Sequence, residues 1–245
     1  MGLLLRIASI FDSISRNAGR ISSWIVLPLI FTIMFDVITR KIDYTRLYFS
    51  DLSIQYGGFS VSTILQDMQW HFHAVLMMMT FGIGYLANAH VRVDIFRELL
   101  SKTKQAWIEI IGLCVLAIPF AIVMIDESFQ LTELAYSQGE GSESLTGIGK
   151  RWIIKSFVLL GFTVLLLAIL TTLFRCIAFV FGTKEQSVEA NKGLLIFPED
   201  AGELEAARLA AERALEEEIE DAAALAEKLA AEKAAEKAAR LGQGN

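Results

Sequence analysis

Side chains that could perform chemistry are few in this chain. Its 245 residues include three histidines, His71, His73 and His90, and two cysteines, Cys114 and Cys176. All three histidines lie in or at the ends of one apolar segment, and on a helix His71 and His73 point about 200° apart. Haem ligation within a helical membrane protein needs histidines that face one another from different helices. The pattern predicts no haem, no metal site and no other cofactor.

Catalytic motifs are missing from the sequence as well. It contains no nucleophile elbow, phosphate-binding loop, dinucleotide fingerprint or zinc-ligand spacing. The cysteines stand alone in apolar segments and form no CxxC pair, so we expect no disulfide. Met77, Met78 and Met79 point in three directions on a helix, which indicates packing and lipid contact instead of a soft-metal site. We therefore expect that the chain is not an enzyme.

Two charged residues, Asp36 and Lys155, lie within apolar segments near what should be the same membrane face. A charge inside a membrane span is costly and usually faces protein or water. Lys155 can reach the interface along its long stem, whereas Asp36 is short and needs a partner. Asp36 either pairs with Lys155, pairs with a basic group of another chain, or meets Arg40 one turn along its own helix.

The elements that must position these residues are four long apolar segments. The mean hydropathy of +0.48 and the 54% of apolar residues are typical of a membrane protein and not of a soluble domain. The segments cover residues 21–38, 72–89, 107–125 and 152–174. Each can cross most or all of a hydrocarbon core about 30 Å thick as a helix. The sequence therefore predicts an all-α membrane protein with four transmembrane helices.

The stretches around these segments carry further signals. Residues 1–20 place Leu3, Ile7, Ile10, Phe11 and Ile14 on one side of a helix, a pattern typical of an amphipathic helix in the membrane surface. Pro119 should kink the third segment or interrupt its regular hydrogen bonding. The connection at 126–149 is acidic and rich in glycine, which predicts an irregular loop.

The composition changes beyond Pro198. Residues 199–245 hold 13 of the 28 acidic residues but only 6 of the 22 basic ones, so the first 198 residues are close to neutral. Alanine, glutamate and lysine dominate this tail, which is typical of a long charged helix, either solvated or with a short coiled-coil seam. We expect an interfacial helix at 1–20, a membrane domain at 21–181, a linker at 182–200 and a cytoplasmic helical tail at 201–245.

Lysine and arginine are unequally shared between the two ends of the predicted spans. Ten lie within 1–20, 90–106 and 175–192, against six within 39–66 and 126–155. Cytoplasmic loops carry the positive excess in membrane proteins, so both termini are expected in the cytoplasm. No strongly basic face is present, which argues against a nucleic-acid partner.

The second apolar segment has the most distinctive residues. Trp70 is expected at the membrane–water boundary, where its amphipathic ring prefers to lie. Gly82 and Gly84 form a small-residue patch that allows another helix to approach closely. The polar corner that follows carries His90, Arg92 and Asp94. In one interpretation, these side chains cap the span and bind a neighbouring segment or lipid headgroups. In the other, Arg92 only adds positive charge on the cytoplasmic side.

This segment resembles the small (Q-type) membrane subunit of tripartite ATP-independent periplasmic (TRAP) transporters. The resemblance lies in Leu65-Gln-Asp-Met-Gln-Trp70, Gly82-Ile-Gly84 and His90-Val-Arg-Val-Asp94. Gly149-Lys-Arg-Trp-Ile-Ile-Lys155 is similar to the branch grouped with carboxylate and aromatic-acid systems. The likeness covers roughly residues 3–181. The chain departs from the family where Gln66-Asp67 replaces an acidic pair, and in its long charged tail.

The resemblance implies a division of labour in a bacterial inner membrane. A periplasmic solute-binding protein captures an organic acid, a large membrane subunit moves it with sodium ions, and the small subunit braces the large one. Surrounding lipid is the remaining partner. Candidate residues for the contact between subunits are Trp70, Gly82, Gly84, His90, Arg92, Asp94, Asp36 and Lys155. Two alternatives stay open: a membrane anchor of a redox enzyme, which needs cofactor ligands, and a small channel, which needs a polar path.

Overall fold

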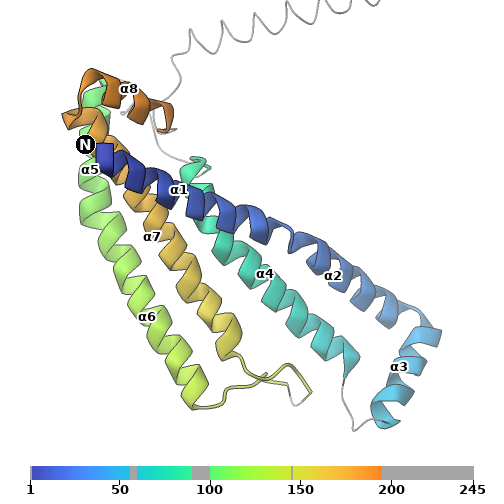
Figure 1. The fold of residues 1–245 in the computed structure, drawn as a ribbon. Coiled ribbons are helices and arrows are strands. Elements are labelled where there is room, and N and C mark those ends of the chain that lie inside the picture. The colour runs from blue at the N-terminus through green and yellow to red at the C-terminus, as the bar shows by residue number, and fades with distance from the viewer. Residues whose placement is uncertain (1, 56–59, 90–99, 145, 195–245) are drawn as a thin grey trace, which may run out of the picture. The chain divides into compact units, whose positions relative to one another are not determined.

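The computed structural model describes residues 2–55, 60–89, 100–144 and 146–194. These residues form helices joined by short connections, with no strand among them, which confirms the all-α class (Figure 1). The chain divides into two compact units, Met1–Phe197 and Pro198–Asn245. The predicted C-terminal helix belongs to the second unit and lies outside the described residues.

The first unit contains eight α-helices and one π-helical segment within the described residues. They are α1 (Gly2–Ser23), α2 (Val26–Lys41), α3 (Asp43–Gln55), α4 (Val61–Leu86), α5 (Lys102–Gly112), η1 (Leu113–Ala117), α6 (Ile118–Ser137), α7 (Trp152–Phe181) and α8 (Lys184–Lys192). Helix α8 occupies half of the stretch that the sequence suggested as a linker.

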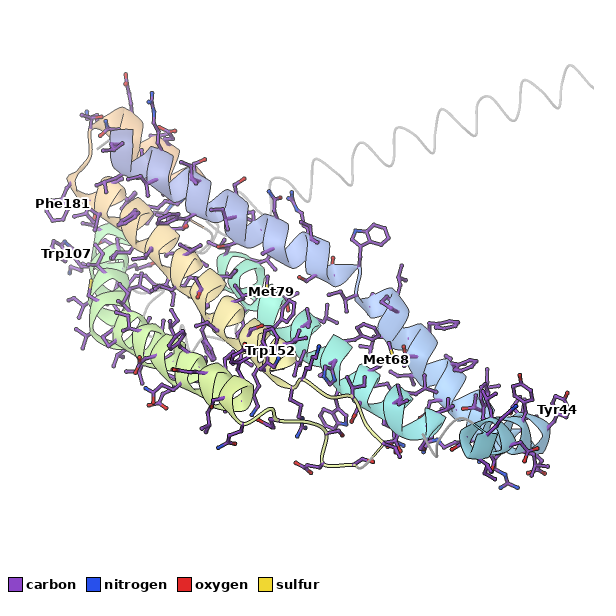
Figure 2. All side chains as sticks on the ribbon, turned by 60° about the horizontal axis from the view of Figure 1, so that its bottom comes forward. Tyr44, Met68, Met79, Trp107, Trp152 and Phe181 are labelled. Carbon is purple, nitrogen blue, oxygen red and sulfur yellow. The ribbon has the colours of Figure 1, made fainter. Side chains whose placement is uncertain are left out.

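Helix α7 lies at the centre of the bundle. It runs between α4 and α6, and α1 crosses over it (Figure 1). Apolar side chains from three consecutive elements, Leu113 of η1, Ala121 of α6 and Ile169 and Leu173 of α7, form its main core. Figure 2 shows Trp107 beside Phe181 at one end of this bundle, with ring centroids 5.5 Å apart. The continuously apolar sequence of α7 follows from its contacts with neighbours on several sides.

Helix α1 packs through a face of small residues. Ala8, Ser15, Gly19 and Ser22 are buried against the bundle, whereas the predicted apolar stripe on the adjoining side keeps Leu3, Ile10 and Ile14 exposed. Small residues allow close backbone approach, which supplies packing energy in lipid. The helix itself is as expected, and its position at the membrane surface stays a prediction.

Three helical stretches of the described residues are long and apolar enough to cross a membrane. They are Gly2–Lys41, which joins α1 and α2, Lys102–Ser137 and Trp152–Phe181. Helix α4 is not among them, because Gln66, Asp67 and Gln69, with two histidines beyond them, make its first half polar. The predicted number of four transmembrane helices is therefore not confirmed.

The predicted loop at 126–149 was wrong over its first half. Helix α6 continues through Ser137, and the loop occupies 138–151. Acidic residues do not stop a helix, and the stop signal is Gly139. Its φ of +60° is left-handed, and Glu140 N–H bonds the Ala135 carbonyl at 3.0 Å, as in a Schellman ending.

The irregularity expected at Pro119 is confirmed. The π-helical segment Leu113–Ala117 lies directly before it. Proline lacks an N–H and its ring clashes with the carbonyl four residues earlier, so a local change of hydrogen-bonding pattern lets the helix continue into α6.

Candidate functional site

Asp36 of α2 is the most deeply buried charged side chain of the described residues, with 1% of its surface exposed. Its Oδ1 accepts a hydrogen bond from the Ser62 hydroxyl of α4 at 2.9 Å. Its Oδ2 takes an ion pair with Arg40 and a 3.4 Å hydrogen bond from Gln69 Nε2. Of the alternatives that the sequence left open, the structure therefore shows the pair with Arg40.

Lys155 has a different partner. Its Nζ pairs with Glu140, three residues beyond the end of α6. Arg151 Nη1 approaches Glu140 at 3.8 Å and Glu143 at 3.6 Å. The predicted pair of Asp36 with Lys155 is wrong, because the 138–151 loop brings its own carboxylates to the start of α7. Sequence reasoning missed Glu140, although its position after a helix-ending glycine could have marked it.

Asp67 of α4 forms a hydrogen bond to the 138–151 loop. Its Oδ2 accepts a hydrogen bond from the Ile148 N–H at 2.8 Å, across 81 residues of sequence. Gly147 lies so close that an added Cβ would collide with Asp67 and Ser142. The polar first half of α4 is thus used inside the chain, where it binds α2 through Gln69 and the loop through Asp67.

Gly82 and Gly84 have different surroundings. A Cβ added to Gly82 would lie 2.6 Å from Val164 Cγ1 of α7 and 3.2 Å from Ser15 Cβ of α1, whereas one at Gly84 meets nothing within 4 Å. On the neighbouring turns, Gly19 contacts Ile83, and Gly161 contacts Met78. The small-residue patch therefore joins α1, α4 and α7 of this chain through Gly82, and no such contact is found at Gly84.

An ion pair that sequence analysis missed anchors α1 to α7. Arg175 Nη1 lies 3.2 Å from Asp12 Oδ1 and donates to the Gly193 carbonyl at 2.9 Å, while Asp12 also pairs with Arg16 at 2.9 Å. Arg175 follows directly after the fourth apolar segment, and this position could have marked it in the sequence as a candidate for an ion pair. The contact supports the small-residue packing at the same end of the helices.

Trp70 stands on the outer face between α2 and α4, with 74% of its surface exposed. Together with Gln69, His73, Leu29 and Ile33 it lines an open groove of about 330 Å³. Three further residues of the predicted contact set, His90, Arg92 and Asp94, lie outside the described residues. Within the described residues no three His, Cys, Asp or Glu side chains gather to hold a metal ion.

The described residues form a helical bundle with three membrane-length stretches, in which the buried charge of Asp36 is paired within the chain. A family model of the DctQ component of tripartite ATP-independent periplasmic transporters matches residues 29–179, more than half of the chain. The chain belongs to this family, whose members are the small subunits of TRAP transporters and are not enzymes. No curated protein and no solved structure matches the chain.

Proposed function

We propose that the chain braces the large membrane subunit of a TRAP transporter, which takes up an organic acid together with sodium ions, while a periplasmic solute-binding protein delivers the acid. The observation that carries this proposal is the internal pairing of Asp36. Ser62, Gln69 and Arg40 occupy its carboxylate oxygens, so it offers no ready place for a transported ion. Asp36 therefore fits a structural role better than a place on an ion pathway.

The outer surfaces support a bracing role. Helix α2 exposes large apolar side chains along its length, and so do α5, η1 and α6. They include Leu27, Ile30, Phe31 and Met34 of α2, and Ile111, Leu116, Phe120 and Val123 of the α5–α6 stretch. Soluble monomers rarely expose apolar patches of this extent. Lipid and another membrane protein are the environments that such surfaces fit.

We infer that α4 crosses the membrane as the remaining span. Its 26 residues give a length of about 39 Å, enough for a bilayer core. Two of its polar groups bond other elements of the chain, since Gln69 bonds Asp36 and Asp67 bonds the 138–151 loop. Pairing of this kind lets polar residues lie at membrane depth. With both termini in the cytoplasm, as the positive-inside distribution favours, the chain is a multi-pass protein of the inner membrane.

The groove between α2 and α4 is our candidate for the contact with the large subunit. His73 is exposed there, about 18 Å along α4 from its start. An ionisable ring facing hydrocarbon would be costly, whereas a protein partner can supply a hydrogen bond. Trp70 offers a large apolar surface with a polar N–H, as residues that dominate interfaces do. Gly84 and the corner of His90, Arg92 and Asp94 complete the proposed set, while Gly82, Asp36 and Lys155 contribute through contacts inside the chain.

The test is co-purification of the chain with the large subunit, followed by sodium-driven uptake in vesicles with the binding protein added. Trp70→Ala should weaken co-purification at least about tenfold if the indole is an interface anchor. Trp24→Ala is the matched control, because Trp24 is also 72% exposed but lies in the turn between α1 and α2. Equal retention of both variants would reject the groove, and uptake that needs no small subunit would reject the bracing role. No observation in the described residues favours the redox-anchor alternative.

A further inference from the structure

A second hollow lies at the far end of α2, away from the Trp70 groove. It has a volume of about 290 Å³ and is bounded by the end of α2, by α3 and by the start of α4. Arg40 and Arg46 line it together with Ser50 and Ser60. No Asp or Glu is among the described residues that line it. Two guanidinium groups and several serines around one hollow favour an anion.

Both arginines have donors to spare. Among the described residues Arg40 pairs with buried Asp36 through Nη2, and a guanidinium carries five N–H donors in a planar fork. Arg46 Nη2 lies 2.9 Å from Asp43 Oδ1, and both side chains are exposed. Exposed pairs of this kind contribute little, so an incoming anion can replace Asp43. The fork matches two oxygens of a phosphate at once.

The N-terminus of α4 adds the partial positive charge of a helix dipole to the two arginines. Ser60 is its N-cap and accepts a hydrogen bond from the Thr63 N–H at 3.3 Å, while Val61 and Ser62, the first helical residues, line the hollow. The first turn of a helix presents unbonded N–H groups and the positive end of the helix dipole, which favour phosphate.

The surroundings indicate the depth of a lipid headgroup. Tyr44 and Tyr48 are exposed on α3, and tyrosines gather where membrane meets water; Figure 2 shows Tyr44 at this end. Phe49 and Ile54 give the hollow an apolar side. The planar fork of an arginine binds the oxygens of a phosphate group, whether a lipid headgroup or a soluble ester carries it. We propose that the hollow binds a phosphate group, carried by a phospholipid or by a soluble phosphate ester.

The experiment uses the full-length chain, purified in detergent and stripped of lipid. Dioleoyl phosphatidylglycerol, glycerol 3-phosphate and dioleoylglycerol are titrated separately, with binding followed by native mass spectrometry and calorimetry. The wild type should bind a phosphate-bearing probe, and Arg46→Gln should bind it at least about tenfold more weakly, since hydrogen bonds from charged groups are lost. Arg46→Lys should lie between them because it keeps the charge but loses the fork.

Lys41→Gln is the matched control, because Lys41 is exposed at the same end of α2 but does not line the hollow. It should bind as the wild type does. Binding of phosphatidylglycerol without glycerol 3-phosphate assigns the site to lipid, and binding of both, or of glycerol 3-phosphate alone, extends it to soluble esters. Unchanged binding in Arg46→Gln, equal binding of dioleoylglycerol, or no binding of either phosphate probe overturns the proposal. The helical circular dichroism of each variant verifies folding.

Discussion

The carboxylate of Asp36 on α2 accepts the Ser62 hydroxyl of α4 at 2.9 Å. This contact joins two helices across 26 residues of sequence, and the ion pair with Arg40 lies on its other oxygen. The Asp36 carboxylate is buried against α4 while Arg40 is half-exposed, so the buried charge holds two elements of the bundle together.

A double-mutant cycle tests this contact. Asp36→Ala should lower the free energy of unfolding by about 1–3 kcal/mol, because it leaves the Ser62 hydroxyl and the Gln69 amide unpaired. Its effect should couple to Ser62→Ala by at least about 0.5 kcal/mol and be additive with Lys155→Met. Thermal and denaturant unfolding in detergent supply the measurement. Coupling to Lys155 and none to Ser62 would contradict the structure.

The two glycines of α4 should respond oppositely to alanine. Gly82→Ala forces Val164 or the α4–α7 spacing to move, and should cost about 1–3 kcal/mol of unfolding free energy. Gly84→Ala meets nothing within 4 Å and should be neutral or stabilising by up to about 1 kcal/mol. If Gly84→Ala destroys co-purification with the large subunit while unfolding is unchanged, the open face is covered by that partner.

Glu140 should control the order of the 138–151 loop. Glu140→Gln removes the charge that holds Lys155 and Arg151, so amide exchange in this loop should become faster, with a loss of stability on the order of 1 kcal/mol. Glu143→Gln is the comparison, since the Glu143 side chain is 93% exposed against 28% for Glu140. Similar rates of amide exchange in both variants would show that the loop is held by the hydrogen bond between Ile148 and Asp67 and not by Glu140.

Cysteine labelling tests the orientation. In a chain with Cys114 and Cys176 replaced, a cysteine at Ser101 or Ser187 should react only from the cytoplasmic side, and one at Ser142 only from the periplasm. The physical reason is the excess of lysine and arginine beside the termini. Labelling of Ser101 from the periplasm would reverse the whole topology.

Local composition determined much of this protein. The presence of helices over the third and fourth apolar segments, the helical character of residues 2–23 and the irregularity before Pro119 depend on residues close in sequence, and the structure agrees with each. The third helix, however, continues to Ser137, beyond the expected end at residue 125. The same local motifs carried the resemblance to the TRAP small subunit. The polar first half of α4 also follows from local composition. Because this half is polar, the sequence alone does not determine whether the protein has three or four membrane spans.

Only the tertiary structure decided which polar groups and which glycines meet. Asp36 had acceptable partners at several sequence distances, and the packing of α2 alongside α4 selected Ser62 and Gln69 beside Arg40. Lys155 met Glu140 because α6 extends to Ser137 and delivers the loop to the start of α7. Gly82 and Gly84 look alike in sequence, yet two positions apart on a helix they point about 200° away from each other. One therefore touches Val164 while the other stays open, because such contacts are set by how rigid helices cross and not by the residues next to them in the chain.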